Sequence, residues 1–408
     1  MKLERVASLD AFRGFDILAM TFVNYIAGMA AVPFILRHAP ADMDAFTLTD
    51  VVFPGFLFIV GVAIPLSLQK RIARGDSPGR ILERILVRTA SLLFLGLIMA
   101  NEGLYSSRET GLSKGLWYFL AYLAVIALWT IYPKTEKRRQ RSAYLGLRIA
   151  AALLLAFLVV IFRAKGDDGS VTWLQIPWWG ILGIIGWCYL TGSVVYLISK
   201  GRPAALMGAM SFMIALHIGS RHGVLDFLAP VNRILDIGRD LGSHSAIVVA
   251  GILVGTLFTS GTGVKKPRER IISMGVFGTG LCLAGYLLRP LHGFSKIQGT
   301  ESYALVTSGI CCLLFLMTYV LMDIFKIRRW AQFLQPVGRN PLLAYILPSI
   351  IDDVLSFASH VFKVNIKQLF WPFWEKGGLA GMLNAVAMTG LILLITWAMT
   401  RAKVILKL

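Results

Sequence analysis

His38 and Asp50 are of the residue types that perform acid–base chemistry, and they lie close together in the chain. His38 is followed by Ala39 and Pro40, and Asp50 directly precedes an apolar run that reads Val-Val-Phe-Pro-Gly-Phe-Leu-Phe. An imidazole titrates near neutral pH, and a carboxylate that fixes one of its tautomers makes it a better general base. Two plainer interpretations stay open: Asp50 caps a helix that begins there, and His38 is a solvated loop histidine.

A stripe of polar side chains follows the first apolar stretch of the chain. Asp10 and Arg13 are three residues apart and therefore adjacent on one face of a helix. The same stripe reaches Asn24, about 21 Å from Asp10 along the helix axis. Alternatively, Asp10 and Arg13 form a local ion pair at the inner membrane surface, while Asn24 hydrogen-bonds a neighbouring helix.

The segment Gly-Arg-Asn-Pro at residues 338–341 combines a helix start with a cation. Asn340 is suited to cap the helix that follows, and Pro341 is suited to its first position. A helix N-terminus beside Arg339 also offers a corner that accepts a phosphate group. The sequence therefore favours a structural role here and allows a ligand-binding one.

The elements that position these residues are expected to be membrane-spanning helices. Of the 408 residues, 56% are hydrophobic and only 15% are charged, and the mean hydropathy is +0.69. These values exclude an ordinary water-soluble enzyme and a disordered protein. A bilayer crossing takes about 20 apolar residues, and the qualifying stretches lie at 10–32, 50–69, 84–101, 116–132, 144–162, 177–199, 203–217, 245–260, 271–288, 304–325, 339–358 and 381–400.

We therefore predict an all-α polytopic membrane protein with about 12 transmembrane helices, or about 10–12 if short stretches such as 203–217 and 245–260 re-enter the membrane. The expected inner loops and both chain ends carry about twice as many Lys and Arg as the outer loops. Since cytoplasmic loops carry the excess of cations, both termini are expected in the cytoplasm. The same bias explains the formal net charge of +19 without a nucleic-acid partner.

All six histidines fall at or beyond the outer ends of the predicted spans: His38, His217, His222, His244, His292 and His360. His217 and His222 are five residues apart, which does not place two metal ligands on one helix face, so we predict no bound metal. His217 and Arg221 could line an outward-facing cavity, although ordinary surface positions are more common. Six tryptophans are expected in an aromatic belt rather than a sugar-stacking platform: Trp117, Trp173, Trp178, Trp179, Trp371 and Trp374.

Several motifs of this chain occur together in one known family. Residues 8–14 read Ser-Leu-Asp-Ala-Phe-Arg-Gly, residues 22–25 read Phe-Val-Asn-Tyr, and the histidine loop ends in the apolar run that begins at Asp50. Residues 338–345 read Gly-Arg-Asn-Pro-Leu-Leu-Ala-Tyr. This combination resembles the heparan-alpha-glucosaminide N-acetyltransferase family, strongly over residues 5–70 and 335–347 and only in hydropathy between them.

The resemblance implies an enzyme that moves an acetyl group from cytoplasmic acetyl-CoA to a glucosamine amine on the other side of the membrane. His38 matches the catalytic histidine of the family, and Asp50 and Asn24 match its polar partners. An imidazole at the outer face would take the proton of the attacking amine or hydroxyl, or carry the acyl group itself.

The donor, acetyl-CoA or another acyl-CoA, is anionic and needs cations at the inner end of the bundle. We expect Arg13 with Asp10, and Arg339 with Asn340, to bind it. No metal is expected to take part.

The histidine loop departs from the family pattern. The family usually continues His-x-x-Trp-x-Gly, whereas here Ala-Pro-Ala-Asp-Met follows His38. We therefore predict a different acceptor, an extracytoplasmic amino sugar or glycan of a bacterial-type cell envelope. The whole chain, 1–408, is expected to form a single transmembrane acyltransferase domain in the plasma membrane, with a homodimer left open. The rival hypothesis is a transporter or flippase of a lipid-linked or small sugar, which has no reason to hold CoA.

Overall fold

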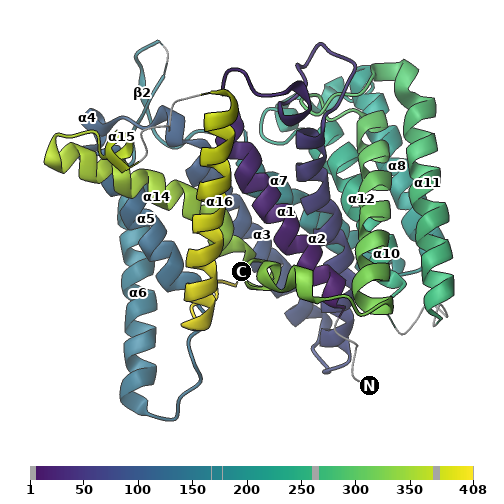
Figure 1. The fold of residues 1–408 in the computed structure, drawn as a ribbon, viewed down its shortest axis with the longest axis horizontal. Helices are drawn as coiled ribbons and strands as arrows, with labels where there is room; N and C mark the ends of the chain where they lie inside the picture. Colours follow the sequence, from purple (N-terminus) through teal and green to yellow (C-terminus); the bar gives the residue numbers. More distant parts are fainter. Residues whose placement is uncertain (1–5, 167, 177, 260–265, 371–376, 408) are drawn as a thin grey trace. The chain divides into compact units, whose positions relative to one another are not determined.

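A computed structural model describes all residues except 1–5, 167, 177, 260–265, 371–376 and 408 (Figure 1). The long helices are α1 (Ala7–Ile26), α2 (Leu48–Ile72), α3 (Pro78–Ala100), α5 (Lys114–Trp129), α6 (Arg138–Ile161), α7 (Gly180–Ser199), α8 (Pro203–Arg221), α10 (His244–Thr256), α11 (Pro267–His292), α12 (Glu301–Tyr319), α14 (Pro341–Phe362) and α16 (Gly378–Arg401). The short helices are η1 (Phe34–Leu36), η2 (Glu102–Leu104), α4 (Ser107–Thr110), η3 (Asp226–Leu228), α9 (Ala229–Asn232), η4 (Ile237–Ser243), η5 (Val320–Ile324), η6 (Arg329–Leu334), α13 (Gln335–Arg339) and α15 (Ile366–Phe370). A small antiparallel hairpin pairs β1 (Ala164–Lys165) with β2 (Val171–Thr172).

Each predicted span falls on one of the long helices. Within the described part of the chain, nine helical segments are long and apolar enough to cross a membrane. The other three predicted spans are α1 and α3, which carry charged residues in their first halves, and α5, which has 16 residues. The chain is therefore an all-α multi-pass membrane protein, while the cytoplasmic placement of both termini stays a prediction.

Internal contacts divide the chain into two compact units, each built from segments that are far apart in sequence. Unit 1 consists of Met1–Asp16, Pro33–Gly96 and Trp178–Gln332, and unit 2 consists of Ile17–Val32, Leu97–Pro177 and Phe333–Leu408. The sequence predicts one domain over 1–408. In the structure, α1 gives its first half to unit 1 and its second half to unit 2.

Unit 1 is held together by backbone-to-backbone packing of α2 against α10. A Cβ atom on Gly61 would lie 2.0 Å from the carbonyl oxygen of Val248, and one on Gly251 would lie 2.0 Å from that of Phe58. Small residues let apolar helices approach this closely in a membrane, where packing replaces the hydrophobic effect. Every residue of α10 is buried, so this helix forms the centre of unit 1.

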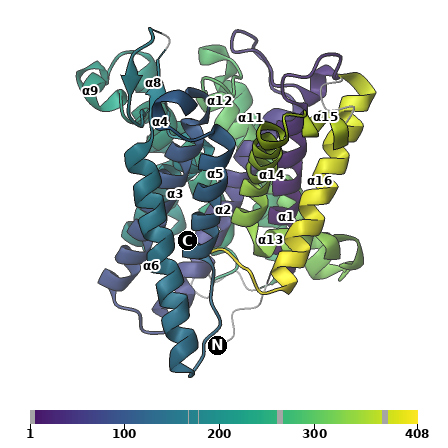
Figure 2. The same cartoon turned by 90° about the vertical axis from the view of Figure 1, so that its left-hand side faces the viewer.

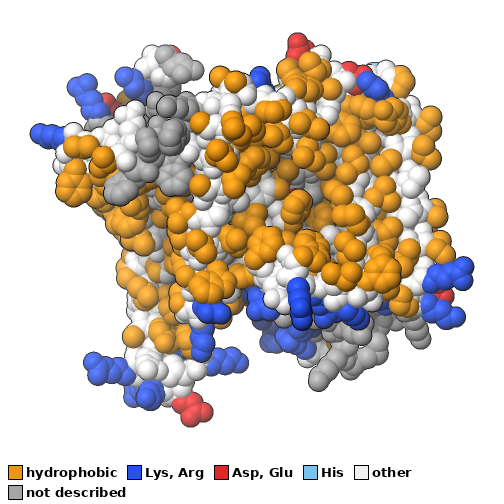
Figure 3. Space-filling view, in the orientation of Figure 1, with side chains coloured by type: hydrophobic (Ala, Val, Ile, Leu, Met, Phe, Trp, Pro, Cys, Tyr) orange, Lys and Arg blue, Asp and Glu red, His pale blue; other side chains and the backbone are white. Residues whose placement is uncertain are grey.

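The helices of unit 1 lie side by side, with α2, α8, α10, α11 and α12 visible together in Figure 1. Over α11 and α12, hydrophobic side chains cover the visible surface, and Lys and Arg gather at the end where α11 begins (Figure 3). Val276 and Leu287 of α11 are exposed. An apolar band bounded by charge is the surface that a bilayer requires.

Unit 2 contains α5, α6, α14 and α16, which Figure 2 shows from the side of α6. Leu153 and Phe157 project outward from α6 with 66% and 58% of their surface exposed, which suits contact with lipid. Trp117 is fully buried and donates from Nε1 to the carbonyl of Leu158 over 3.0 Å, so its predicted place in an aromatic belt is wrong. Trp173 and Trp178 are exposed, whereas Trp371 and Trp374 lie outside the described residues.

Candidate active site

His38 and Asp50 form a hydrogen-bonded pair at the start of α2 in unit 1. His38 lies in the loop after η1, and its Nδ1 is 2.7 Å from Oδ1 of Asp50. The Asp50 carboxylate is fully buried, whereas 35% of the His38 side chain is exposed. The structure therefore joins a buried carboxylate to an imidazole that a ligand can reach.

The other oxygen of Asp50 fixes the loop that carries His38. Its Oδ2 accepts hydrogen bonds from the backbone N–H groups of Ala39 and Thr47, at 3.1 Å and 3.0 Å, and from the Thr47 hydroxyl at 3.1 Å. Thr47, not Asp50, is the N-cap residue of α2, and Asp50 takes part in capping as the third helical residue of a capping box. Asp50 therefore ties the histidine loop to the helix start.

This geometry selects one tautomer of His38. An ionised carboxylate only accepts hydrogen bonds, so Nδ1 carries the proton and donates it to Asp50. The lone pair is then on Nε2, as a general base requires. The backbone carbonyl of Asp50 also accepts from the buried Tyr303 hydroxyl at 2.5 Å, which anchors the start of α2 to α12.

Lys296 is a third member of this site, and sequence reasoning missed it. It lies between α11 and α12, and its Nζ is 3.0 Å from Nδ1 and 3.2 Å from Nε2 of His38. Its distance to Oδ1 of Asp50 is 4.0 Å. Burial lowers the pKa of Lys296 to about 8, with Asp50 acting in the opposite direction. A single lysine in a loop has no motif that could have identified it.

A cavity of about 300 Å³ in unit 1 adjoins Lys296. Aromatic and aliphatic side chains share its lining with three basic ones, and the lining residues are Phe53, Trp178, Ile181, Ile184, Arg239, His244, Lys296 and Ile297. The Nδ1 atom of His244 lies 3.4 Å from Oδ1 of Asp240, which also accepts from Nε of Arg239 at 3.2 Å. A second imidazole–carboxylate contact therefore borders the cavity that Lys296 reaches.

Glu301, at the start of α12, connects two more histidines of unit 1. Its carboxylate is fully buried, 2.9 Å from Nδ1 of His292 and 3.5 Å from Nε2 of His217. His217 is itself buried, so an ordinary surface position is wrong for it. Arg221 donates to Gln298 at 2.9 Å, and a cavity shared by the two residues stays a prediction. Among the residues that the structure describes, no group of three or more His, Cys, Asp or Glu could hold a metal ion.

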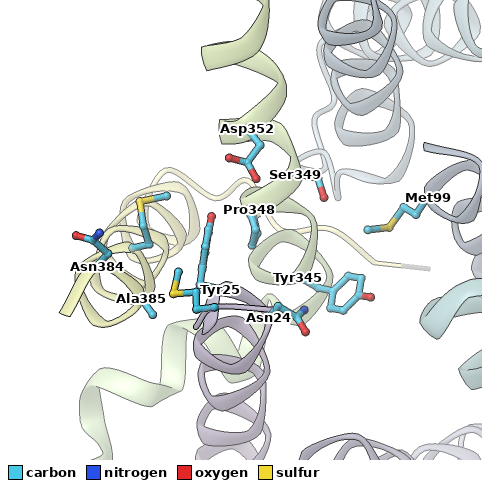
Figure 4. Close-up of a pocket in the computed structure, with 11 residues that line it drawn as sticks. Asn24, Tyr25, Met99, Tyr345, Pro348, Ser349, Asp352, Asn384 and Ala385 are labelled. Atoms are coloured by element: carbon cyan, nitrogen blue, oxygen red, sulfur yellow. The ribbon is translucent and has the colours of Figure 1, made fainter. Parts of the chain in front are cut away.

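Asn24 belongs to unit 2, where it lines a cavity of about 260 Å³ at the end of α1. Figure 4 shows Asn24 and Tyr25 of α1 with Tyr345, Ser349 and Asp352 of α14 around this space. The structure thus brings His38 and Asp50 together in unit 1 and gives Asn24 a polar pocket of its own in unit 2.

The residues expected to bind the donor are also divided between the units. In unit 1, Nη1 of Arg13 is 3.8 Å from Oδ1 of Asp10, so the ion pair predicted from their spacing is confirmed. In unit 2, Arg339 is exposed and its Nη2 donates to Gln335 at 3.4 Å. Donor binding by these residues stays a prediction.

Asn340 occupies the predicted position before Pro341 and α14, but its side chain does not cap the helix. Its Nδ2 donates to the carbonyl of Val404 at 2.8 Å, and its Oδ1 accepts from the N–H of Leu406 at 3.0 Å. The residue is fully buried. Asn340 therefore fastens the C-terminal segment to the start of α14, and Arg339 is the exposed member of this corner.

Fold and site together define a multi-pass helical membrane protein with an imidazole–carboxylate pair at the start of one helix. The chain belongs to the family described as a domain of unknown function (DUF5009), whose model matches residues 5–226. It is similar to the heparan-alpha-glucosaminide N-acetyltransferase of Homo sapiens, with 25% identity over 380 residues that cover 86% of this chain and 54% of the relative. The Mus musculus protein of the same name is 23% identical over 377 residues, with the same coverage. The chain thus spans about half the length of the curated relatives it matches.

Proposed function

We propose that this protein is a transmembrane acyltransferase that moves an acetyl group from cytoplasmic acetyl-CoA to the amine of an extracytoplasmic amino sugar. The observation that carries the proposal is the 2.7 Å contact between His38 Nδ1 and the buried Asp50 carboxylate. It leaves a basic Nε2 on a partly exposed ring. The similarity to two proteins named N-acetyltransferases supports the same reaction class.

In the proposed reaction, His38 acts as the base. The neutral amine of the sugar attacks the thioester carbonyl as Nε2 accepts its proton, and the resulting imidazolium is stabilised by Asp50. The C–S bond breaks, and the proton returns to the CoA thiolate. A transient acyl group on His38, passed on to the amine in a second step, uses the same residues.

The acceptor is proposed to bind in the cavity beside Lys296. Trp178, which the sequence placed in an aromatic belt, lines this cavity and offers a flat ring on which a sugar can stack. Arg239 and His244 offer hydrogen-bond donors around it. Asn24, which lines a separate pocket in unit 2, is proposed as a further polar residue that takes part in the reaction. Because the loop after His38 departs from the resembled family, we propose a bacterial cell-envelope sugar rather than heparan.

For the donor, we propose phosphate contacts by Arg13, held by Asp10, and by Arg339 at the start of α14. The buried Asn340 would act indirectly by fixing the segment that carries Arg339. The proposed location is the plasma membrane, with both termini inside. The bilayer, acyl-CoA and a sugar acceptor are the proposed partners.

The test uses the full chain in sealed proteoliposomes, with labelled acetyl-CoA on one side and glucosamine on the other. Labelled N-acetylglucosamine that forms only when the donor faces the cytoplasmic side supports the proposal. A purified protein that shows no CoA-dependent thermal shift at millimolar CoA, and instead exchanges lipid-linked or free sugar across the vesicle, would favour the flippase.

A further inference from the structure

The amine of Lys296 lies within hydrogen-bond distance of the base that the acceptor amine has to reach. In the proposed reaction, the attacking nitrogen must approach Nε2 of His38 within hydrogen-bond distance. The Lys296 Nζ is 3.2 Å from that atom. It also lines the cavity in which an acceptor would bind. A primary amine of the protein itself therefore stands beside the base.

We propose that Lys296 is an internal acyl acceptor, which His38 acetylates when acyl-CoA is bound and the acceptor cavity is empty. The inference rests on the proposed function, because it takes its acetyl group from the same donor. Its product is an Nε-acetyl-lysine in the acceptor cavity. The modification would switch the enzyme off when donor is present without sugar.

The chemistry balances with donor and protein alone. The neutral Nζ attacks the thioester carbonyl, so that an N–C bond forms and the C–S bond breaks. His38 Nε2 takes the proton that Nζ loses and gives it to the departing CoA thiolate. The products are acetyl-lysine and CoA, and no oxidant, reductant or metal is needed.

The surroundings of Lys296 favour the neutral amine that this attack needs. Three-quarters of its side chain is buried, since 25% is exposed. With a pKa of about 8, roughly a tenth of the amines are neutral at pH 7. An unperturbed lysine, with a pKa of about 10.4, has well under one in a thousand. Lys296 is therefore a far better nucleophile at neutral pH than an ordinary surface lysine.

Acetylation would also block the site by simple geometry. An amide on Nζ cannot carry the charge that faces Asp50 at 4.0 Å. The added acetyl group would have to lie in the cavity or against the His38 ring. Both positions exclude the amine of an external acceptor, and an amide does not hydrolyse spontaneously on the enzyme's time scale.

The experiment incubates the purified full chain with labelled acetyl-CoA in the absence of sugar and locates the label by peptide mass spectrometry. We expect roughly one CoA released per chain and one acetyl group on Lys296 that survives hydroxylamine, which removes acyl-imidazoles. Lys296→Arg should abolish this label. In the wild type, preincubation with acetyl-CoA should lower the rate of transfer to sugar in proportion to the label on Lys296. Lys114→Arg is the matched control, because Lys114 is 43% exposed and lies 3.2 Å from Glu102, and it should change neither result.

Several results would overturn the inference. One is a label spread over exposed lysines with Lys296 unmodified. Another is equal labelling of Lys296 in His38→Ala, which would mean that His38 does not direct the transfer. If glucosamine is acetylated while Lys296 stays unlabelled, the inference fails and the proposed function stands. If acetyl-CoA is consumed neither with nor without sugar, both fail.

Discussion

Replacing Asp50 by Asn tests how the buried carboxylate controls His38. Among the described residues, Oδ2 accepts from three donors and Oδ1 only from His38. The Asn oxygen is therefore expected on the Oδ2 side, since the opposite orientation would leave two buried backbone N–H groups unpaired at about 1–3 kcal/mol each. The Asn NH₂ group then faces Nδ1 of His38 and forces the proton onto Nε2.

The expected fall in rate follows from the hydrogen bond between His38 and Asp50 that the substitution removes. The variant loses the charge-assisted hydrogen bond from His38 Nδ1 to the Asp50 carboxylate, worth about 1.5–3 kcal/mol, which corresponds to roughly a ten- to a hundred-fold lower rate. We expect a free energy of unfolding lowered by a similar amount, because the same bond stabilises the loop.

The assay compares initial rates of acetyl transfer to glucosamine for wild type, Asp50→Asn and the control Asp42→Asn, with thermal unfolding measured in parallel. Asp42 is exposed in the same loop, so its variant should match the wild type in both measurements. A wild-type rate in folded Asp50→Asn would refute the assignment of Asp50 as the residue that orients His38.

Three further predictions concern packing, donor binding and orientation. Gly251→Ala should lower the free energy of unfolding by at least about 1–3 kcal/mol, because its Cβ would lie 2.0 Å from the carbonyl oxygen of Phe58. Gly280→Ala, which has open space around its Cβ, should not lower the melting temperature, and equal effects of the two changes would contradict the packing. Arg13→Gln should raise the dissociation constant of CoA roughly ten- to a hundred-fold by calorimetry, and an unchanged constant would exclude Arg13 from the donor site. A cysteine at position 38 should react with an impermeant thiol reagent from outside the cell and one at position 139 only from inside, whereas labelling of position 38 exclusively from the cytoplasm would reverse the proposed topology.

The helices could be predicted well because hydropathy is a local signal. Each predicted span falls on a long helix, and α10, preceded by the π-helical η4, covers residues 245–256 of the short predicted stretch. The division into two units was not predictable. It depends on contacts between distant segments, and one helix, α1, contributes to both units.

Only part of the site could be predicted from the sequence, because the rest also depends on contacts between distant segments. His38 and Asp50 lie in one loop and in the helix that follows it, so their residue types and short spacing predicted the pair. Lys296 reaches the pair from 258 positions away and has no motif. The sequence correctly predicts a helix start at Asn340. The side chain of Asn340, however, hydrogen-bonds the distant Val404, and no local pattern predicts that contact.

The most direct test of the central claim is the acetyl-transfer rate of His38→Ala at saturating donor and acceptor. Its ring is partly exposed and its loop keeps the backbone contact from Ala39 to Asp50, so the variant should fold and still bind acetyl-CoA. Removal of a general base lowers a rate by about 10²–10⁴-fold, and we predict a loss of that size. A His38→Ala protein that acetylates the sugar at the wild-type rate would contradict the account.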